Sequence, residues 1–537
     1  MSGSITLENR FGVNKMELIS LKYAIFVIVL LVLYYCFPKK YRWYVLLAGS
    51  MAYYVIICKW YVLFIIFTIC TTYGSTIWID KLLKKQNAIV KSHKEDWDRQ
   101  TRKEYKEKGR KKRVAVMLFA LLCNFGILAF LKYIPYAGEL GLLLPLGISF
   151  YTFQSMGYVM DVYREIVEPE KNFLKVALFV SFFPQIIQGP IAIYDKLAGQ
   201  LYEGHSLRLE NLQKGALLVL WGVMKKLVIA DRAVNIINFV MDKPMDFSGT
   251  YVFFAAVVYA LQLYADFSGG IDIVRGIAEM FGITMSTNFN HPYFSRSLTE
   301  YWHRWHMTLG DWCRNYIFYP LSISKRFLNF GKWLKPRFGA HISKVLPGCI
   351  ASVITFIVIG VWHGANMKYL YFGLWNGIVI MLAELFAPVN KKVAGGFFKL
   401  TGLREKGIFA TIVSVLWTFM LILVGYYFDI AANASTAFHM LFKSVTDFHI
   451  SELGINNIIL NLGACGLDEY DILLLIICTL LWFFISFVEE NKKLDMRDFI
   501  LSRKLPLRWA IIYLGIFIVI IFGYYGPGVN PADFVYM

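Results

Sequence analysis

The chain has 537 residues, of which 57% are hydrophobic and only 17% are charged, and its mean hydropathy is positive. This composition excludes an ordinary soluble globular protein and indicates a protein that crosses a membrane several times. The formal charge of +18 does not indicate a nucleic-acid partner, because the Lys and Arg residues lie in short stretches between apolar segments and form no recognisable nucleic-acid module.

The apolar segments predict helices that cross the membrane. They are far longer than the roughly 10-residue alternating strands of a membrane barrel, so we expect an all-α polytopic fold. We treat residues 1–537 as a single membrane domain, with N-terminal spans in 1–137, a core in 138–390 and C-terminal spans in 391–537. The expected spans are 20–37, 43–58, 61–79, 114–133, 140–159, 212–230, 251–267, 346–363, 370–386, 408–428, 472–488 and 509–525, with a shorter, broken segment at 173–193.

Charge predicts how these spans are oriented. Residues 81–113 carry fourteen Lys or Arg against five Asp or Glu, which places this stretch in the cytoplasm and the N-terminus outside. The basic stretches 325–344 and 391–406 agree with alternating crossings, and 431–471, with one Lys and five acidic residues, should face outward. Each basic stretch is read as a topology signal; for 325–344, docking of an acidic partner is the alternative.

Two polar stretches interrupt apolar segments in the first half of the core. Residues 145–164 begin with Pro145 and Gly147, which disturb a helix, and include Gln154. Such polar groups either bond between helices or line a cavity. Residues 182–190 hold Pro184, Gly189 and Pro190, so we expect a broken or re-entrant segment that shapes a cavity wall.

A third polar stretch ends the apolar run at 251–267. Asp266 follows that run, and Ser268, Gly269 and Gly270 are expected to break the helix. Asp266 would then either cap the next helix or orient a histidine, and capping is favoured.

Residues 299–321 are the most distinctive stretch. Apolar and aromatic residues recur there at spacings of three and four, with polar residues such as Thr308 and Asn315 on the opposite side. This pattern predicts one amphipathic helix, closed by Pro320, that lies along or partly within the membrane. His306 lies on the flank of the apolar face and should be buried, whereas His303 lies nearer the polar boundary.

A further histidine stands at the end of an apolar run. Trp362 and His363 end the segment 346–363, Gly364 is a candidate C-cap, and the next run begins near Tyr369. A helix that starts near residue 345 would carry His363 roughly 27 Å from its start, at or beyond the middle of the membrane. A histidine at that depth is either a packing residue or a functional one.

The residue types favour acid–base chemistry over metal chemistry. The sequence has no HExxH motif, and its eight Cys are scattered without a zinc-ligand spacing, so we expect no bound metal or cofactor. A buried neutral histidine can accept a proton from a hydroxyl, as transfer of an acyl group from a thioester to an alcohol requires. Asn366, Gln154 or a backbone N–H would stabilise the developing oxyanion.

The run from Glu300 to Leu321, followed 57 residues after His306 by Trp362-His363-Gly364, resembles the membrane-bound O-acyltransferase (MBOAT) superfamily. The stretches 145–164, 182–191 and 264–276 are similar to its bacterial alginate O-acetylation branch. The resemblance implies a ring of about 11 to 13 transmembrane helices, with re-entrant and amphipathic segments, around a central tunnel. It also implies His363 as the principal catalytic residue and His306 as the second histidine. Relatives often have Asp where Asn315 stands, which puts any role that needs a charge there in doubt.

We therefore expect a plasma-membrane O-acyltransferase. Its acyl donor would be acetyl-CoA or an acyl carrier protein on the cytoplasmic side. Its acceptor would be an exported polysaccharide or cell-wall glycan, reached directly or through an extracytoplasmic acetyltransferase partner. Membrane lipid and a glycan synthase complex would be its other partners. D-alanyl transfer to teichoic acid is the alternative within the superfamily, and a transporter or glycan flippase is the alternative of another class. The supporting residues are Gln154, Asp266, Ser268, Trp305, Asn315, Trp362 and Asn366.

Overall fold

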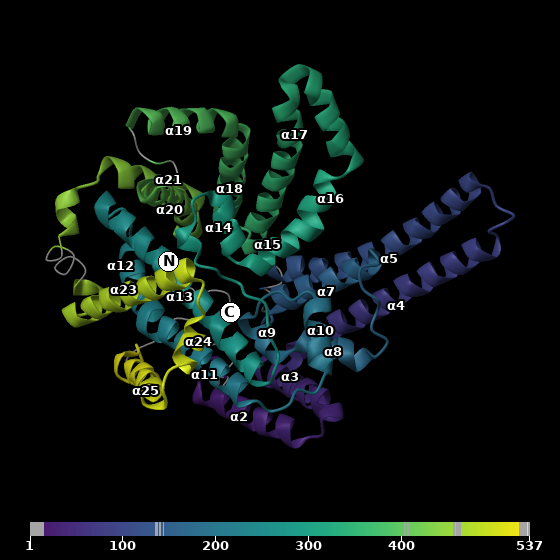
Figure 1. Ribbon diagram of the computed structural model, residues 1–537, viewed down its shortest axis with the longest axis horizontal. Helices are drawn as coiled ribbons and strands as arrows, with labels where there is room; N and C mark the ends of the chain where they lie inside the picture. Colours follow the sequence, from purple (N-terminus) through teal and green to yellow (C-terminus); the bar gives the residue numbers. More distant parts are fainter. Residues whose placement is uncertain are drawn as a thin grey trace. The chain divides into compact units, whose positions relative to one another are not determined.

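The computed structural model describes residues 16–134, 138, 141–142, 144–401, 404, 407–454, 457, 463–525 and 534 (Figure 1). Every regular element in these residues is helical, which confirms the all-α fold. The N-terminal residues 1–15, for which an outside location is predicted, and parts of the expected span 140–159 and loop 431–471 lie outside the described residues. The chain divides into two compact units, one of residues up to Val219 with Gly270–Ser286, and the other of Leu220–Gly269 with the residues from Thr287.

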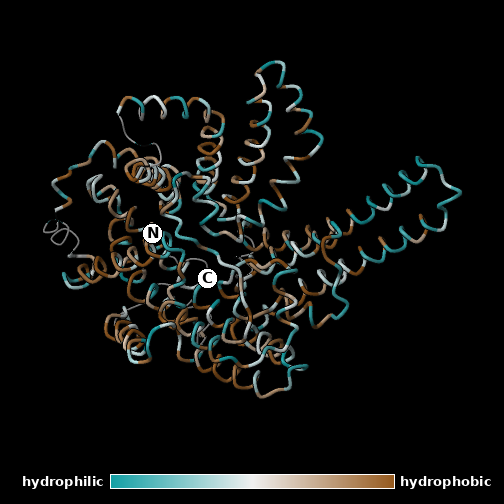
Figure 2. Tube along the Cα trace, in the orientation of Figure 1, coloured by the Kyte–Doolittle hydropathy of each residue, from teal (hydrophilic) through white to brown (hydrophobic). Residues whose placement is uncertain are grey.

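The first unit begins with helices that match the expected spans closely. Its elements are α2 (Leu21–Cys36), η1 (Lys39–Tyr41), α3 (Arg42–Cys58), η2 (Lys59–Tyr61), α4 (Val62–Ser92), α5 (Arg99–Tyr133), α7 (Ile148–Tyr163), α8 (Phe173–Ser181), α9 (Phe183–Gln188), α10 (Tyr194–Tyr202), most of α11 (Leu209–Met224) and the end of α13 (Gly249–Met280). Helices α4 and α5 lie side by side as a long hairpin whose distal ends are hydrophilic (Figures 1 and 2). That hydrophilic end coincides with the basic stretch 81–113, which is therefore helical over most of its length.

The broken segment in the first unit is confirmed. Helix α8 ends at Ser181 and α9 begins at Phe183, with Phe182 in a non-helical conformation between them. Buried side chains satisfy the backbone at this break, since the N–H of Phe183 donates to Ser50 Oγ at 3.1 Å. A hydrogen bond of this kind is what allows irregular backbone inside an apolar environment.

The second unit holds the remaining elements. They are η3 (Lys225–Ala230, π-helical), α12 (Asp231–Met241), most of α13, η4 (Pro292–Phe294), α14 (Leu298–Arg304), α15 (Met307–Cys313), η5 (Arg314–Phe318, π-helical), α16 (Tyr319–Ser322), α17 (Lys325–His363), α18 (Met367–Leu385), α19 (Ala387–Thr401), α20 (Ile408–Ile430), α21 (Ala434–Thr446), η6 (Ile450–Leu453), η7 (Gly463–Cys465), α23 (Glu469–Lys492), α24 (Met496–Leu501) and α25 (Leu505–Phe522). Helix α17 is kinked at Gly339, and α18 packs beside the part of α17 that follows the kink (Figure 1).

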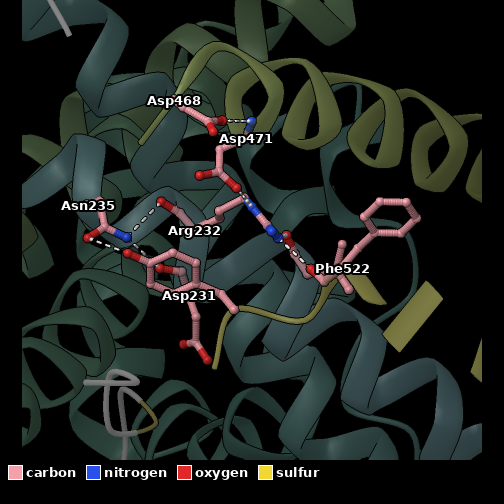
Figure 3. Close-up of polar contacts among 8 residues, drawn as sticks. Asp231, Arg232, Asn235, Asp468, Asp471 and Phe522 are labelled. Carbon is pink, nitrogen blue, oxygen red and sulfur yellow. Dashed lines mark hydrogen bonds and ion pairs between the residues drawn. The ribbon is translucent and has the colours of Figure 1, made fainter. Parts of the chain in front are cut away.

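A buried arginine joins three helices of this unit. Arg232 on α12 donates from Nε to Asp471 Oδ1 on α23 at 2.8 Å, and from Nη1 to the carbonyl of Phe522 at the end of α25 at 2.8 Å (Figure 3). Asp471 is in turn held at the start of α23, where its N–H donates to Asp468 Oδ1. Because the guanidinium is planar and has five N–H donors, one side chain can satisfy groups on several elements at once.

The chain is a multi-pass membrane protein. By length and composition, seven helices in the described residues can cross a membrane, or eight if the bent pair α18 and α19 forms one span. This number is smaller than the 11 to 13 that we expected. The difference has two causes. Helices α2, α7 and α11 have 16 residues each and are too short to be counted as spans. The expected spans 43–58 and 61–79 belong to one nearly continuous helical run, Lys39–Ser92, and are counted once. A ring around a central tunnel stays a prediction.

Candidate active site

The second unit contains a small pocket between its helices. Helices α14, α15, α17, α18 and α20 contribute to its wall, together with one residue of α13. Its lining residues are Leu263, Tyr301, Trp302, Trp305, His306, Leu309, His363, Phe372, Asn376, Ile422, Tyr426 and Asp429. The pocket therefore brings together the two histidines that the sequence singled out, although 57 residues separate them in the chain.

His306 occupies a break between two short helices. The prediction of one continuous amphipathic helix is wrong, because α14 ends at Arg304 and α15 begins at Met307. His306 has φ 43° and ψ 50°, the left-handed conformation that residues other than Gly rarely adopt. This backbone conformation costs roughly 1–3 kcal/mol of free energy and persists only where the surrounding structure enforces it.

The neighbouring segment that contains Asn288 and Asn290 holds this break in place. The N–H of Met307 donates to the carbonyl of Asn288 at 2.9 Å, and the N–H of Asn290 donates to the carbonyl of Arg304 at 3.0 Å. These two hydrogen bonds flank His306 and satisfy backbone groups that a continuous helix would have paired internally. The spacing of apolar and polar residues in 299–321 could not predict these hydrogen bonds, because Asn288 and Asn290 lie outside that stretch.

The imidazole of His306 is buried, as predicted, with 3% of the residue exposed, whereas His303 is exposed. Its Nδ1 lies 3.2 Å from Asn288 Oδ1, and its ring packs against Phe267 at 4.8 Å between centroids and Trp362 at 6.2 Å. Burial in these surroundings, together with the nearby His363, lowers the pKa of His306 to about 3. The ring is therefore neutral at physiological pH.

His363 ends α17 and is half-buried. Its ring lies within aromatic packing distance of Trp362, Tyr369 and Phe372, at 4.8, 5.9 and 5.4 Å between centroids. Gly364 is the C-cap, as expected, although its backbone is extended rather than left-handed. The turn to α18 is completed by Asn366, whose side chain accepts from the N–H of Lys368 at 3.1 Å.

Aromatic residues form much of the remaining wall. Trp305, a predicted supporting residue, is buried and stacks on Tyr301 at 5.6 Å between centroids. The hydroxyls of Tyr301, Tyr426 and Tyr293 lie in a row, at 2.7 and 3.1 Å, and the last donates to the carbonyl of Ala260 at 2.6 Å. Because the hydroxyl of Tyr293 donates its only hydrogen to the carbonyl of Ala260, the hydroxyl of Tyr426 must donate to Tyr293. The hydroxyl of Tyr301 must in turn donate to Tyr426.

Asp266 and Ser268 have a different role from the one predicted. Helix α13 continues through both residues. Gly269 packs closely against the carbonyl of Gly222, which would lie 2.9 Å from a Cβ at this position. Asp266 is fully buried and accepts from Lys226 Nζ at 2.6 Å, and Ser268 Oγ accepts from Lys225 Nζ at 2.9 Å. Asp266 therefore does not cap a helix. Both side chains instead bind adjacent lysines on the π-helical turn η3.

Three other predicted supporting residues lie in distinct settings. Gln154 belongs to the first unit, where it donates to the carbonyl of Phe179 at 2.6 Å and accepts from Gln185. Asn315 is half-buried in the π-helical turn η5. Asn366 is exposed at the N-cap of α18. An oxyanion-stabilising role for Gln154 or Asn366 stays a prediction, whereas the hydrogen bonds that these two side chains make within the chain are structural.

Sequence reasoning missed several polar residues of the site. Asn288 binds His306, while Asn376 and Asp429 line the pocket. Asn376 accepts from Trp302 Nε1 at 3.0 Å, and Asp429 accepts from the hydroxyl of Tyr259 at 2.8 Å. The sequence could have indicated Asn376 and Asp429, because burying an amide or a carboxylate inside an apolar run is costly. Asn288 lies in a polar connection, where nothing in the sequence sets it apart.

No group of three His, Cys, Asp or Glu side chains that could hold a metal ion occurs in the described parts of the chain. The polar groups of the pocket are imidazole, indole, phenol, amide and one carboxylate. These groups can hold and transfer protons and can bind hydroxyl groups.

Residues 169–335 match the membrane-bound O-acyltransferase (MBOAT) family. This match covers less than a third of the chain. The matched residues include the break at His306 and end 28 residues before His363.

Curated relatives agree with this assignment. The chain is 30% identical over 315 residues to the probable alginate O-acetylase AlgI of Pseudomonas syringae, covering 58% of this chain and 54% of that protein. It is 30% identical over 314 residues to the peptidoglycan O-acetyltransferase of Helicobacter pylori, covering 51% and 56%. It is 26% identical over 288 residues to the teichoic acid D-alanyltransferase of Bacillus subtilis, covering 52% and 67%. The resemblance to the family and to its alginate O-acetylation branch is therefore confirmed, while the chain spans little more than half the length of the first two relatives.

Proposed function

We propose that this MBOAT protein is an O-acyltransferase that moves an acetyl group from a thioester to a hydroxyl of a glycan. The observation that carries the proposal is the convergence of His306 and His363 on one pocket, from two helical breaks that the fold holds independently. The names of the relatives support the reaction class, because two of them are an O-acetylase and an O-acetyltransferase.

The proposed reaction is acyl transfer with His363 as general base. His363 accepts the hydroxyl proton of the acceptor while the oxygen attacks the thioester carbon. A C–O bond forms, the C–S bond breaks, and the proton passes from His363 to the departing thiolate. His306 is neutral and positions one of the two substrates. The aromatic wall around Trp305 excludes water, which protects the thioester from hydrolysis.

The donor and its side of the membrane are part of the proposal. The donor is a cytoplasmic acyl thioester, either acetyl-CoA or an acyl carrier protein, and it is consumed as a substrate. The excess of Lys and Arg in residues 81–113 supports a cytoplasmic location for the α4–α5 hairpin, and therefore an N-terminus outside the plasma membrane. The acceptor is an exported polysaccharide or cell-wall glycan, or an extracytoplasmic acetyltransferase partner that completes the transfer.

D-alanyl transfer is the second candidate. The teichoic acid D-alanyltransferase of Bacillus subtilis is matched over 67% of its length, a larger share than for the acetyl-transferring relatives, although at 26% rather than 30% identity. Both candidates use the same site and the same chemistry. They differ only in the acyl group, so labelled donors decide between them.

The test uses the full chain in membrane vesicles that contain the producing cell's own glycans. Vesicles receive acetyl-CoA labelled in the acetyl group, and ester-bound label in the glycan is measured together with release of the thiol. The informative variant is His363→Ala, and His303→Ala is its matched control, because His303 is an exposed histidine on the same segment as His306. We expect His363→Ala to be folded and to lose at least about 100-fold in rate, as for loss of a general base, with His303→Ala near wild type.

Retained transfer in His363→Ala would remove that residue from the reaction. Ester-bound label that appears with labelled D-alanine on its carrier protein, and not with labelled acetyl-CoA, would favour the second candidate. A glycan flippase, which is the rival of another class, predicts movement of glycan without consumption of thioester, and His306→Ala would then change transport alone.

A further inference from the structure

The side-chain oxygen of Asn288 lies within hydrogen-bonding distance of three groups. Asn288 Oδ1 lies 3.1 Å from the backbone N of Thr308, 2.9 Å from Thr308 Oγ1 and 3.2 Å from His306 Nδ1. Asn288, His306 and Thr308 are all buried. In such surroundings two donors or two acceptors in contact with each other are costly, so the direction of each hydrogen bond can be assigned.

The backbone N–H of Thr308 fixes which way the amide of Asn288 points. A backbone N–H can only donate, so the atom that faces it must be the amide oxygen, because the amide nitrogen would place two donors against each other. That oxygen can only accept. His306 Nδ1, which contacts the same oxygen, must therefore carry a hydrogen.

This hydrogen on Nδ1 determines the state of the other ring nitrogen. A neutral imidazole has one N–H and one bare nitrogen, so the nitrogen without hydrogen is Nε2. Nδ1 is turned toward Asn288, which is not a lining residue, while the ring itself lines the pocket. The bare nitrogen accepts hydrogen bonds and cannot donate them.

We propose that Asn288 is a positioning residue that holds His306 in the Nδ1–H form, so that Nε2 binds the hydroxyl of the glycan acceptor. This inference rests on the proposed acyl transfer and decides which substrate His306 serves. A hydroxyl has a hydrogen to offer to a bare nitrogen, whereas the thioester group itself has only acceptor oxygen and sulfur atoms. At the reacting groups, His306 therefore binds the acceptor hydroxyl and not the thioester.

The backbone of Asn288 supports the same arrangement. Its carbonyl accepts from the N–H of Met307, the residue after His306, at 2.9 Å. Side chain and main chain of one residue thus fix both the left-handed backbone of His306 and the rotation of its ring. This is the pattern by which outer residues orient a functional histidine and select its tautomer.

The tautomer can be observed without any enzymatic activity. The full chain is prepared in lipid with histidine that carries ¹⁵N at Nδ1 alone, and its solid-state NMR spectrum is recorded at pH 7.5. The His306 signal is the one of nine that disappears in His306→Gln. We expect a protonated Nδ1 in the wild-type chain. A bare Nδ1 there would overturn the proposal, whatever the variants show.

Three variants test the role of Asn288. Asn288→Ala removes the acceptor, and we expect Nδ1 of His306 to lose its hydrogen to Nε2. Asn288→Asp keeps an acceptor oxygen at the same place and should keep Nδ1 protonated. Thr308→Val is the matched control, because it removes one hydrogen bond to Asn288 but leaves Oδ1 and the backbone N–H in place. An unchanged spectrum in Asn288→Ala would show that Asn288 does not set the tautomer.

Kinetics in the same membrane vesicles distinguishes the two substrates. In Asn288→Ala we expect the rate at saturating acetyl-CoA to fall about tenfold, the equivalent of one lost hydrogen bond to the acceptor. The KM for acetyl-CoA should not change. A raised KM for acetyl-CoA would mean that His306 binds the donor. If wild-type vesicles transfer no acetyl group, the proposed function fails, while the NMR result still decides the tautomer.

Discussion

Gly360 on α17 and Gly373 on α18 lie in direct backbone contact. A Cβ on Gly360 would stand 3.3 Å from the Cα of Gly373 and would overlap the carbonyl oxygen of Tyr369. A Cβ on Gly373 would in turn overlap the carbonyl oxygen of Phe356. The two helices can pack this closely only because both positions lack a side chain, as in other membrane helix pairs that use small residues. His363 is three residues beyond Gly360, so this contact sets its place in the pocket.

The first prediction concerns this contact. Gly360→Ala should push α17 away from α18 and displace His363, because neither backbone can yield without moving a helix. A displacement of about 1 Å at a reacting group can cost about 100-fold in rate, so we expect a loss of that order in acetyl transfer together with a lower melting temperature.

Gly348→Ala is the matched control on the same helix. A Cβ at Gly348 would meet no atom within 4 Å, and Ala favours a helix by about 1 kcal/mol relative to Gly. This variant should therefore be as active as wild type and equally or more stable. Equal losses of activity in the two variants would show that general weakening of α17, and not the contact with Gly373, is responsible.

The second prediction follows from the lowered pKa of His306. An unfolded histidine has a pKa near 6.5, and the folded chain holds this one near 3. Between these values the unfolded chain binds the additional proton, so the free energy of unfolding should fall as pH falls below 6.5. At pH 5 the loss from this group is about 2 kcal/mol.

The measurement compares melting temperatures at pH 7.5 and pH 5 for His306→Asn and for the wild type. The difference between the two pH values should be smaller in His306→Asn. His303→Asn, at an exposed histidine, should behave as the wild type. An equal pH dependence in all three chains would contradict a buried, neutral His306.

Hydropathy predicted most of the helices, and the spacing of apolar residues in 299–321 predicted the burial of His306. Long apolar runs form helices in any membrane environment, so the segments around α3, α5, α20 and α23 were placed to within a few residues at their apolar ends. The two histidines were found because ionisable groups in apolar stretches are costly and therefore informative.

The break at His306 could not be predicted from local pattern. The spacing of Trp302, Trp305 and Leu309 fits one helix, but the backbone of Asn288 and Asn290 competes successfully for the hydrogen bonds at the break. Asp266 shows the same limit, since its partner Lys226 lies 40 residues earlier in the chain. Tertiary hydrogen bonds between distant residues override local preference in both cases.

The third prediction concerns Arg232, which holds α12 to α23 and to the end of α25 (Figure 3). Arg232→Met keeps much of the volume but leaves the carboxylate of Asp471 and the carbonyl of Phe522 without this donor. Asp471 is partly exposed, so the cost is moderated by water, and we expect a loss of roughly 1–3 kcal/mol.

Thermal unfolding in detergent, followed by tryptophan fluorescence, measures this loss. Lys84→Ala is the control, because its ion pair with Asp80 lies on the surface and should contribute little to stability. A melting temperature for Arg232→Met that equals that of Lys84→Ala would argue against Arg232 as a structural link between the three helices.

The fourth prediction separates two carboxylates that share one ammonium group. Lys226 Nζ lies 2.6 Å from Asp266 and 2.9 Å from Asp231, and all three residues are buried. One cation cannot balance two buried anions, and burial raises the pKa of Asp231 to about 6, despite the opposing effect of Lys226.

Because this folded-state pKa is higher than that of an unfolded Asp, the folded chain binds the additional proton between about pH 4 and 6. Stability from this group should therefore be lost as pH rises through 6. Asp231→Asn should remove that loss and leave the chain at least as stable as wild type at pH 7.5. Asp266→Asn removes the closer partner of Lys226, so it should lower the melting temperature at the same pH. Equal destabilisation by the two substitutions would show that both carboxylates are ionised and contribute equally to the binding of Lys226.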